Sequence, residues 1–259
     1  QQFGHFHAAG GIAHQPQAVA APEQLHNHIA AFSKGHAPPQ LLIDKSLIVG
    51  AGPLVRVGAA ETLVEVRGSA LSSGAGEAVV IDVAAKGSVT SVTRSTLSGA
   101  KSVFHVLPLA ASGASSLLAR ESVFRGGSVV QLEGEAAALQ WWGIENAYAS
   151  SMTQFLISPK LVAPQEFARD WCEHWGAGHE LLPIFGENGT VMADPPADLS
   201  SIVPQSFALN ETCAAALAGP GGAGVGAQIS QLGPSLQALP KAVPGKKGTG
   251  NNRPATPNF

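Results

Sequence analysis

The sequence predicts an all-β protein, a right-handed parallel β-helix of about five coils with a short N-terminal capping helix and a mostly irregular C-terminal segment. Two observations in residues 41–160 predict this fold. The segment repeats with a period near 25 residues, and each repeat alternates apolar and polar residues like a strand with one buried face. The composition agrees, because only 13% of residues are charged and 30 glycines and 18 prolines favour tight turns.

The repeats are aligned on five anchor residues, separated by 23, 26, 27 and 24 positions. These anchors are Ser46, Ser69, Ser95, Ser122 and Asn146. The residues two positions after the anchors form an apolar column: Ile48, Leu71, Leu97, Phe124 and Tyr148. The residues three positions before form a second column: Ile43, Val66, Val92, Ala119 and Gly143. We expect both columns to face the core.

A second strand is expected in each repeat, because an apolar–polar–apolar triplet recurs after each anchor. The triplets lie at 55–57, 81–83, 104–106, 130–132 and 155–157, and the last has lost its polar middle residue. One such unit cannot bury its own apolar residues, whereas units stacked at ~4.8 Å form a continuous core. A β-sandwich would not keep the columns in register, and the asparagine and leucine framework of a leucine-rich repeat is absent.

The chain outside the repeats divides into three parts. Residues 1–40 are expected to form an arm with a short capping helix over 22–35, or a mobile arm with only a nascent helix. Residues 161–233 are expected to cap the other end, with an amphipathic helical pattern over 164–180. Residues 234–259 form a Gly/Pro-rich tail.

Three short strings in the C-terminal part resemble the closing segment of bacterial right-handed β-helix repeat proteins of the pectin-lyase-like superfamily. They are FALNETCA at 207–214, AGPGG at 218–222 and GAQI at 226–229. The resemblance covers about residues 40–230 and implies the fold, in a non-catalytic bacterial type. It implies little about activity, because that superfamily holds lyases, hydrolases, adhesins and inert scaffolds.

The sequence offers no catalytic cluster of the kind that enzymes of that superfamily stack on neighbouring coils. Its acidic residues are scattered, so we expect no enzyme, no cofactor and no metal. The histidine pairs at 5/7 and 26/28 and the group Glu173, His174 and His179 have spacings that can bind a metal, but no motif fixes a site. Acidic residues beside Trp171 and Trp175, among them Glu180, are interpreted as a solvated face. Exposed tryptophans can stack on sugars, and Trp141 and Trp142 are candidates for such a surface. The column pattern instead predicts that Trp141 is buried and that Trp142 packs under residues 161–185.

The two cysteines, Cys172 and Cys213, both follow the repeats. They could form one disulfide in an oxidising compartment or remain two small buried thiols, and the sequence leaves both alternatives open.

Charge and hydropathy limit the partners. The net charge of −3 provides no basic surplus for phosphates, so we expect no nucleic acid. No apolar run reaches the ~18 to 20 residues of a transmembrane segment. The first residue is Gln1, which we interpret as a mature N-terminus after signal cleavage and hence an extracellular or cell-surface location, or as a piece of a longer chain.

These features favour a structural or assembly protein that forms a homo-oligomer or polymer through its tails and faces. The alternative is a carbohydrate-binding or polysaccharide-active β-helix, with a polysaccharide as partner. An appended module of a larger signalling protein is a third interpretation.

Overall fold

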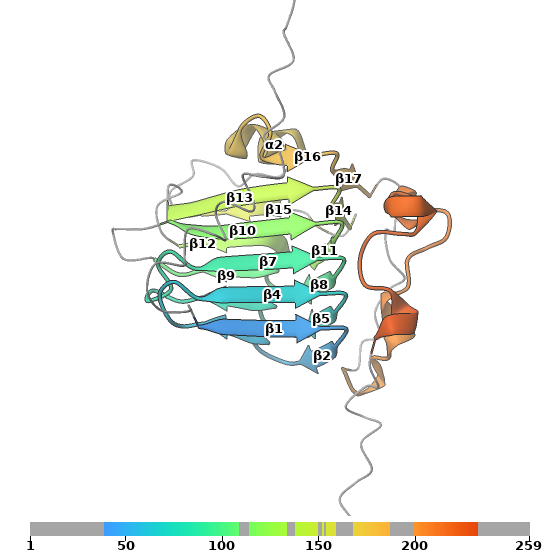
Figure 1. The fold of residues 1–259 in the computed structure, drawn as a ribbon, viewed down its shortest axis with the longest axis horizontal. Coiled ribbons are helices and arrows are strands. Elements are labelled where there is room, and N and C mark those ends of the chain that lie inside the picture. Colours follow the sequence, from blue (N-terminus) through green and yellow to red (C-terminus); the bar gives the residue numbers. More distant parts are fainter. Residues whose placement is uncertain are drawn as a thin grey trace, which may run out of the picture.

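The computed structural model describes residues 39–108, 114–133, 138–149, 152, 154–158, 168–186 and 199–232. They form a parallel β-solenoid with three sheets and one α-helix, which confirms the parallel β-helix (Figure 1). Sheet A contains β1 (Gln40–Asp44), β4 (Leu63–Arg67), β7 (Val89–Thr93), β10 (Ser115–Arg120), β13 (Leu139–Ile144) and β16 (Glu180–Leu181). Sheet B contains β2 (Leu47–Gly50), β5 (Ala70–Ser73), β8 (Thr96–Gly99), β11 (Val123–Gly126), β14 (Ala147–Tyr148) and β17 (Ile184–Phe185). Sheet C contains β3 (Val55–Val57), β6 (Val79–Ile81), β9 (Phe104–Val106), β12 (Ser128–Leu132) and β15 (Gln154–Ile157).

The solenoid has about four turns, so the expectation of five coils was too high. Four full circuits lead from β1 to β13, each returning to the neighbouring strand of sheet A. The next circuit is interrupted by helix α2 (Ala168–Trp175) before it reaches β16 and β17, which have two residues each. The predicted helix at 164–180 ends at Trp175 in the structure, and residues 164–167 lie outside the described residues. The capping helix expected at 22–35 lies outside the described residues.

The two predicted columns are in register from turn to turn. In sheet B, Ile48 pairs with Leu71, Leu71 with Leu97, Leu97 with Phe124, and Phe124 with Tyr148. In sheet A, Ile43 pairs with Val66, Val66 with Val92, Val92 with Ala119, and Ala119 with Gly143. Most of these side chains are fully buried, whereas Ile48 in the first turn is only half-buried.

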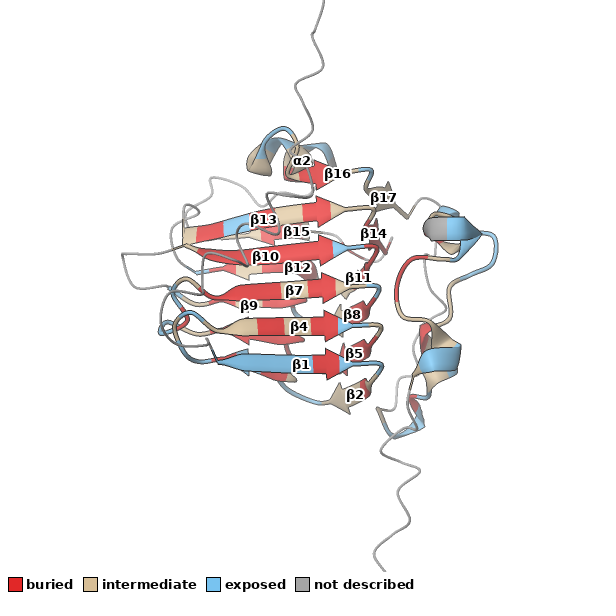
Figure 2. Cartoon of the chain, viewed as in Figure 1, coloured by how far each residue is buried: buried red, intermediate tan, exposed pale blue. Residues whose placement is uncertain are grey.

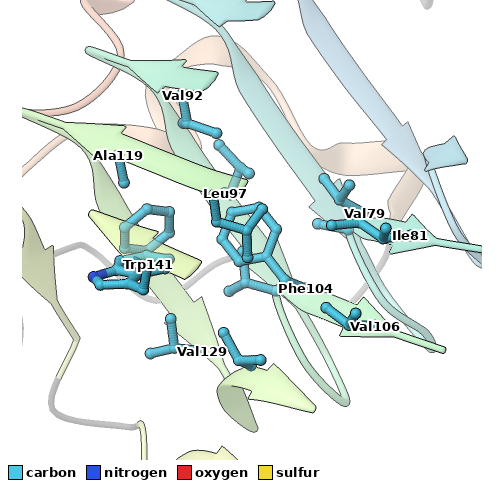
Figure 3. Packing of buried hydrophobic residues seen from close by; sticks show 14 of the residues in the cluster. Val79, Ile81, Val92, Leu97, Phe104, Val106, Ala119, Val129 and Trp141 are labelled. Atoms are coloured by element: carbon cyan, nitrogen blue, oxygen red, sulfur yellow. The ribbon is translucent and has the colours of Figure 1, made fainter. Parts of the chain in front are cut away.

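The interior is filled by the inward side chains of the three sheets (Figure 3). Aliphatic residues fill the first turns, and aromatic rings fill the later ones. Phe104, Phe124 and Trp141 meet edge to face, with ring centroids 5.8 to 6.1 Å apart. Such contacts add to the hydrophobic contribution of each ring, by ~0.5 to 1.5 kcal/mol per pair.

Two of the predicted sheet C triplets were misaligned. The second strand of sheet C is Val79–Ile81 rather than 81–83, and Val55 pairs with Val79. Asp82 lies past the strand, where its carboxylate meets Arg56, and Val83 is 48% exposed. In the last strand, Val130 pairs with Leu156, one residue later than predicted.

In each bend from sheet A to sheet B, the residue at the equivalent position has a left-handed backbone conformation. These residues, with φ between 46° and 54°, are Lys45, Gly68, Arg94, Glu121, Glu145 and Leu182. A non-glycine residue in this conformation costs ~1 to 2 kcal/mol, so the bend needs a stabilising interaction that offsets this cost. The anchor residue that follows each of the first five bends provides it.

The anchors form a ladder of buried side-chain hydrogen bonds along the solenoid. Ser46 N donates to Ser69 Oγ (3.0 Å), and Ser69 N donates to Ser95 Oγ (3.1 Å). The ladder continues from Ser95 N to Ser122 Oγ (3.3 Å) and from Ser122 N to Asn146 Oδ1 (3.1 Å). These bonds satisfy backbone donors that the bend removes from the sheets, since buried N–H groups need a partner. Pro183 occupies the next anchor position, where a side-chain acceptor is missing and the ladder ends.

The C-terminal segment 199–232 lies along the outer face of sheet B (Figure 1, orange). Ile202 and Phe207 pack on Leu47 and Ala70, while Ala215 and Val225 pack on a second cluster with Val123. Gly226 N donates to Glu121 O at 2.7 Å. Both faces of sheet B therefore bury apolar side chains, the inner face in the solenoid core and the outer face under residues 199–232.

The two ends of the solenoid differ (Figure 2). At the far end, Trp171 of α2 is fully buried against Trp141. At the near end, β1, β2 and β3 are the outermost strands of their sheets. Leu41 and Leu42 of β1 are 43% and 51% exposed.

Candidate functional site

Charged side chains on and beside sheet C form a polar group on the solenoid. His105 of β9 lies between two carboxylates, with Nε2 2.8 Å from Glu133 Oε1 and Nδ1 3.7 Å from Glu77 Oε1. Lys101 Nζ lies 3.8 Å from the same Glu77 oxygen. The group thus joins three turns. It could accept or donate protons or hydrogen-bond a hydroxyl-rich ligand.

Similar ion pairs link neighbouring turns elsewhere. Arg56 Nη2 meets Asp82 Oδ2 at 2.6 Å, and the hydrogen bond from Arg56 holds the pKa of Asp82 below its usual range. Arg94 Nε meets Glu121 Oε2 at 2.6 Å, and the side chain of Glu121 is only 2% exposed. The charged groups that the sequence shows as scattered therefore pair across turns.

One carboxylate lies inside the solenoid, at the end covered by α2. Glu180 of β16 is 9% exposed, and its Oε2 accepts three hydrogen bonds from aromatic side chains. The donors are Trp141 Nε1 at 2.5 Å, Tyr148 Oη at 2.9 Å and Trp171 Nε1 at 3.2 Å. The carboxylate thus ties β13, β14 and α2 to β16.

Burial has the largest effect on the pKa of Glu180. It raises the pKa of Glu180, and the hydrogen bonds from the rings oppose the shift without cancelling it. Burial and the nearby Glu180 raise the pKa of Tyr148 well above its usual range. Burial, with a smaller effect of Glu180, also raises the pKa of the Cys172 thiol. Glu180 is therefore an anchoring group in the core.

The interpretation of Glu180 as part of a solvated helix face was wrong. The helix ends at Trp175, and Glu180 pairs with Gly143 in sheet A. A Cβ at Gly143 would lie 2.2 Å from Glu180 Oε2, so only glycine leaves room for the carboxylate. The sequence contains this signal, because the inward column shrinks from Val92 through Ala119 to Gly143 before the large residue arrives.

The described residues whose spacing could bind a metal do not converge, in a chain for which no metal was expected. Glu173 pairs with Arg169 at 2.8 Å, while His174 packs edge to face on Trp175. His179 stacks on Trp142 with ring centroids 4.0 Å apart. Among the described residues, no three His, Cys, Asp or Glu side chains form a group that could hold a metal ion. The histidine pairs at 5/7 and 26/28 lie outside the described residues.

The tryptophans follow the predicted column pattern. Trp141 is fully buried, and its carbonyl oxygen lies 2.8 Å from His179 Nδ1. Trp142 is half-buried under His179.

Cys172 and Cys213 are not bonded to each other in the structure. Cys172 packs beside the main core, and Cys213 packs on the cluster around Val123. None of the helices in the described part of the chain is long and apolar enough to cross a membrane.

Comparison with known proteins found no matching family model, no matching curated protein and no matching solved structure.

Proposed function

We propose that this chain is a structural or assembly protein, a secreted or cell-surface β-helix subunit that self-associates through its tails and faces. The observation that carries the proposal is how its polar groups are used. The carboxylates of Asp82, Glu121 and Glu133 pair with side chains of neighbouring turns, and Glu180 fastens the covered end. These interactions stabilise a rigid scaffold.

The proposal includes a right-handed solenoid of the pectin-lyase-like, bacterial, non-catalytic type. The general preference for right-handed crossovers between parallel strands supports the handedness. The closing strings at 207–214 and 226–229 support the superfamily. In the structure these strings lie along sheet B, where Gly226 N donates to Glu121 O and Ala227 N donates to Thr96 Oγ1.

A polysaccharide-binding role is the second candidate, and the group around His105 favours it. Glu77, His105 and Glu133 lie on three successive turns, and Lys101 lies beside Glu77. Turns spaced by ~4.8 Å would present these hydrogen-bonding groups along an extended sugar chain.

Light scattering of the full chain over a concentration series, with negative-stain imaging of the same samples, tests the structural role. We expect regular assemblies whose mass exceeds the 26.4 kDa of one chain. A monomer at every concentration would contradict the proposal. Binding of that monomer to immobilised polysaccharides, lost in His105→Ala, would then establish the second candidate.

A further inference from the structure

Among the described residues, β1 is the outermost strand of sheet A at the near end of the solenoid and pairs only with β4. In β1, Pro39 O accepts from Leu63 N and Lys45 N donates to Arg67 O, both at 2.9 Å. Because strand residues alternate in direction, the odd-numbered residues of β1 point their backbone groups toward β4. Gln40, Leu42 and Asp44 therefore point theirs to the free edge.

The sequence of β1 is self-complementary around Leu42. In an antiparallel pair of two β1 strands centred on this residue, Leu42 faces Leu42 of the second copy, Leu41 faces Ile43, and Gln40 faces Asp44. The residues at the free edge become the hydrogen-bonded pairs of an antiparallel ladder. Apolar residues meet apolar ones on each face, and polar residues meet at the strand ends.

We propose that two copies of this chain join end to end through β1, related by a two-fold axis that passes midway between the Leu42 residues of the two copies. The proposal rests on the proposed structural function and names its partner as a second copy. Leu41 and Ile43 face inward in their own solenoid, so the pairing joins the two cores. It buries two side chains that are about half exposed in one chain, Leu41 and Leu42.

Among the described residues, sheet A does not offer the same edge at the opposite end. Helix α2 covers the core there through Trp171, and β16 and β17 have only two residues each. A contact through the same patch on both copies closes after two subunits. The assembly is therefore a dimer of about 53 kDa, twice 26.4 kDa.

The first test is sedimentation equilibrium of the full chain and two variants. Leu42→Lys places two like charges opposite each other at the two-fold axis, and we expect it to weaken the dimer by at least about tenfold. Leu217→Lys changes a leucine that is 71% exposed on the C-terminal segment, and we expect it to leave the dimer unchanged. Circular dichroism checks that both variants remain folded, as the exposure of Leu42 predicts.

The second test is crosslinking of Leu42→Cys. Residues in a hydrogen-bonded antiparallel pair have Cα atoms ~5.5 Å apart, a distance that a disulfide spans. We expect mild oxidation to give a covalent dimer with Leu42→Cys but not with Val83→Cys, which is similarly exposed.

The outcomes separate the two proposals. An assembly that Leu42→Lys leaves intact would overturn the end-to-end contact but keep the structural function. Masses that grow steadily past the dimer would overturn the two-fold closure alone. A wild-type chain that stays monomeric would overturn both.

Discussion

A buried hydroxyl and a left-handed backbone residue occur together at the bends between sheets A and B. Ser95 shows the arrangement: its Oγ accepts from Ser69 N at 3.1 Å and donates to Thr93 O at 2.9 Å. The preceding Arg94 has a φ of 46°. The hydroxyl thus satisfies one group from its own turn and one from the neighbouring turn.

Replacement of Ser95 by alanine should therefore cost ~1 to 3 kcal/mol in the free energy of unfolding, because Ser69 N–H is left buried without its acceptor. Urea unfolding followed by circular dichroism measures the change. Ser98→Ala in the following strand, β8, is the control, since Ser98 is half-buried and is not one of the anchor residues. Its effect on the free energy of unfolding should stay near 0.5 kcal/mol. Equal losses in the two variants would show that the ladder adds nothing.

Glu180 makes stability depend on pH. Its pKa in the folded chain is raised above the ordinary value of 4.5, so the folded state holds the proton more tightly. This contribution is complete below pH 4.5 and is lost as the pH rises through the folded pKa. Glu180→Gln cannot ionise, so its free energy of unfolding should not show this fall.

Urea unfolding of wild type and Glu180→Gln at successive pH values checks this prediction. Glu173→Gln is the control, because Glu173 is exposed and bonded to Arg169, and it should follow the wild type. Parallel curves for wild type and Glu180→Gln would contradict a raised pKa.

At the scale of elements, the covered end depends on the space at Gly143. Gly143→Ala places a Cβ 2.2 Å from Glu180 Oε2, against a strand and a core that cannot move freely. We expect a loss of ~1 to 3 kcal/mol in the free energy of unfolding, together with a change in tryptophan fluorescence from Trp141 and Trp171. Gly52→Ala is the matched control, because its Cβ would meet nothing within 4 Å. No difference between the two would mean that β16 does not need this gap.

The C-terminal segment depends on another glycine. Gly226 has a φ of 88°, and its Cβ would lie 2.6 Å from Val123 Cγ2 and 2.8 Å from Thr96 Oγ1. Gly226→Ala should therefore loosen residues 199–232 from sheet B and speed their cleavage in limited proteolysis. Gly222→Ala has a similar φ of 77° but open space, so it should be cleaved at the wild-type rate. Equal cleavage of both variants would show that backbone strain, not the contact, controls the segment.

The elements that follow a strict column were predictable from the sequence, and those that depend on loop length were not. Sheets A and B hold their predicted registers because each turn has one bend at the anchor. The loop before sheet C varies, and Ile81-Asp82-Val83 imitates the triplet pattern, so the register there was off by two residues. The cover over sheet B left a signal one position after the anchors, where Leu47, Ala70, Val123 and Ala147 are apolar and buried although they face outward.

The burial of Glu180 was only partly predictable, because the column that shrinks to Gly143 signals a gap but not which side chain fills it. This burial depends on Trp141, Tyr148 and Trp171 converging from three elements, and no local pattern contains that information.

At the scale of the whole molecule, the described residues give the solenoid one end where helix α2 covers the core and one end where β1, β2 and β3 are the outermost strands. A sheet edge with exposed leucines is a ready template for another strand. The proposed structural function and the proposed end-to-end dimer both rely on this asymmetry, because helix α2 covers the core at one end.

Amide hydrogen exchange of the full chain at several concentrations is the most direct measurement of this account. It predicts that protection of β1, residues 40–44, rises with concentration as the free edge becomes paired. Protection of β7, residues 89–93, should stay constant, because that strand is paired on both sides within one chain. If β1 exchanges at the same fast rate at every concentration, the near end is not an assembly surface and the account is wrong.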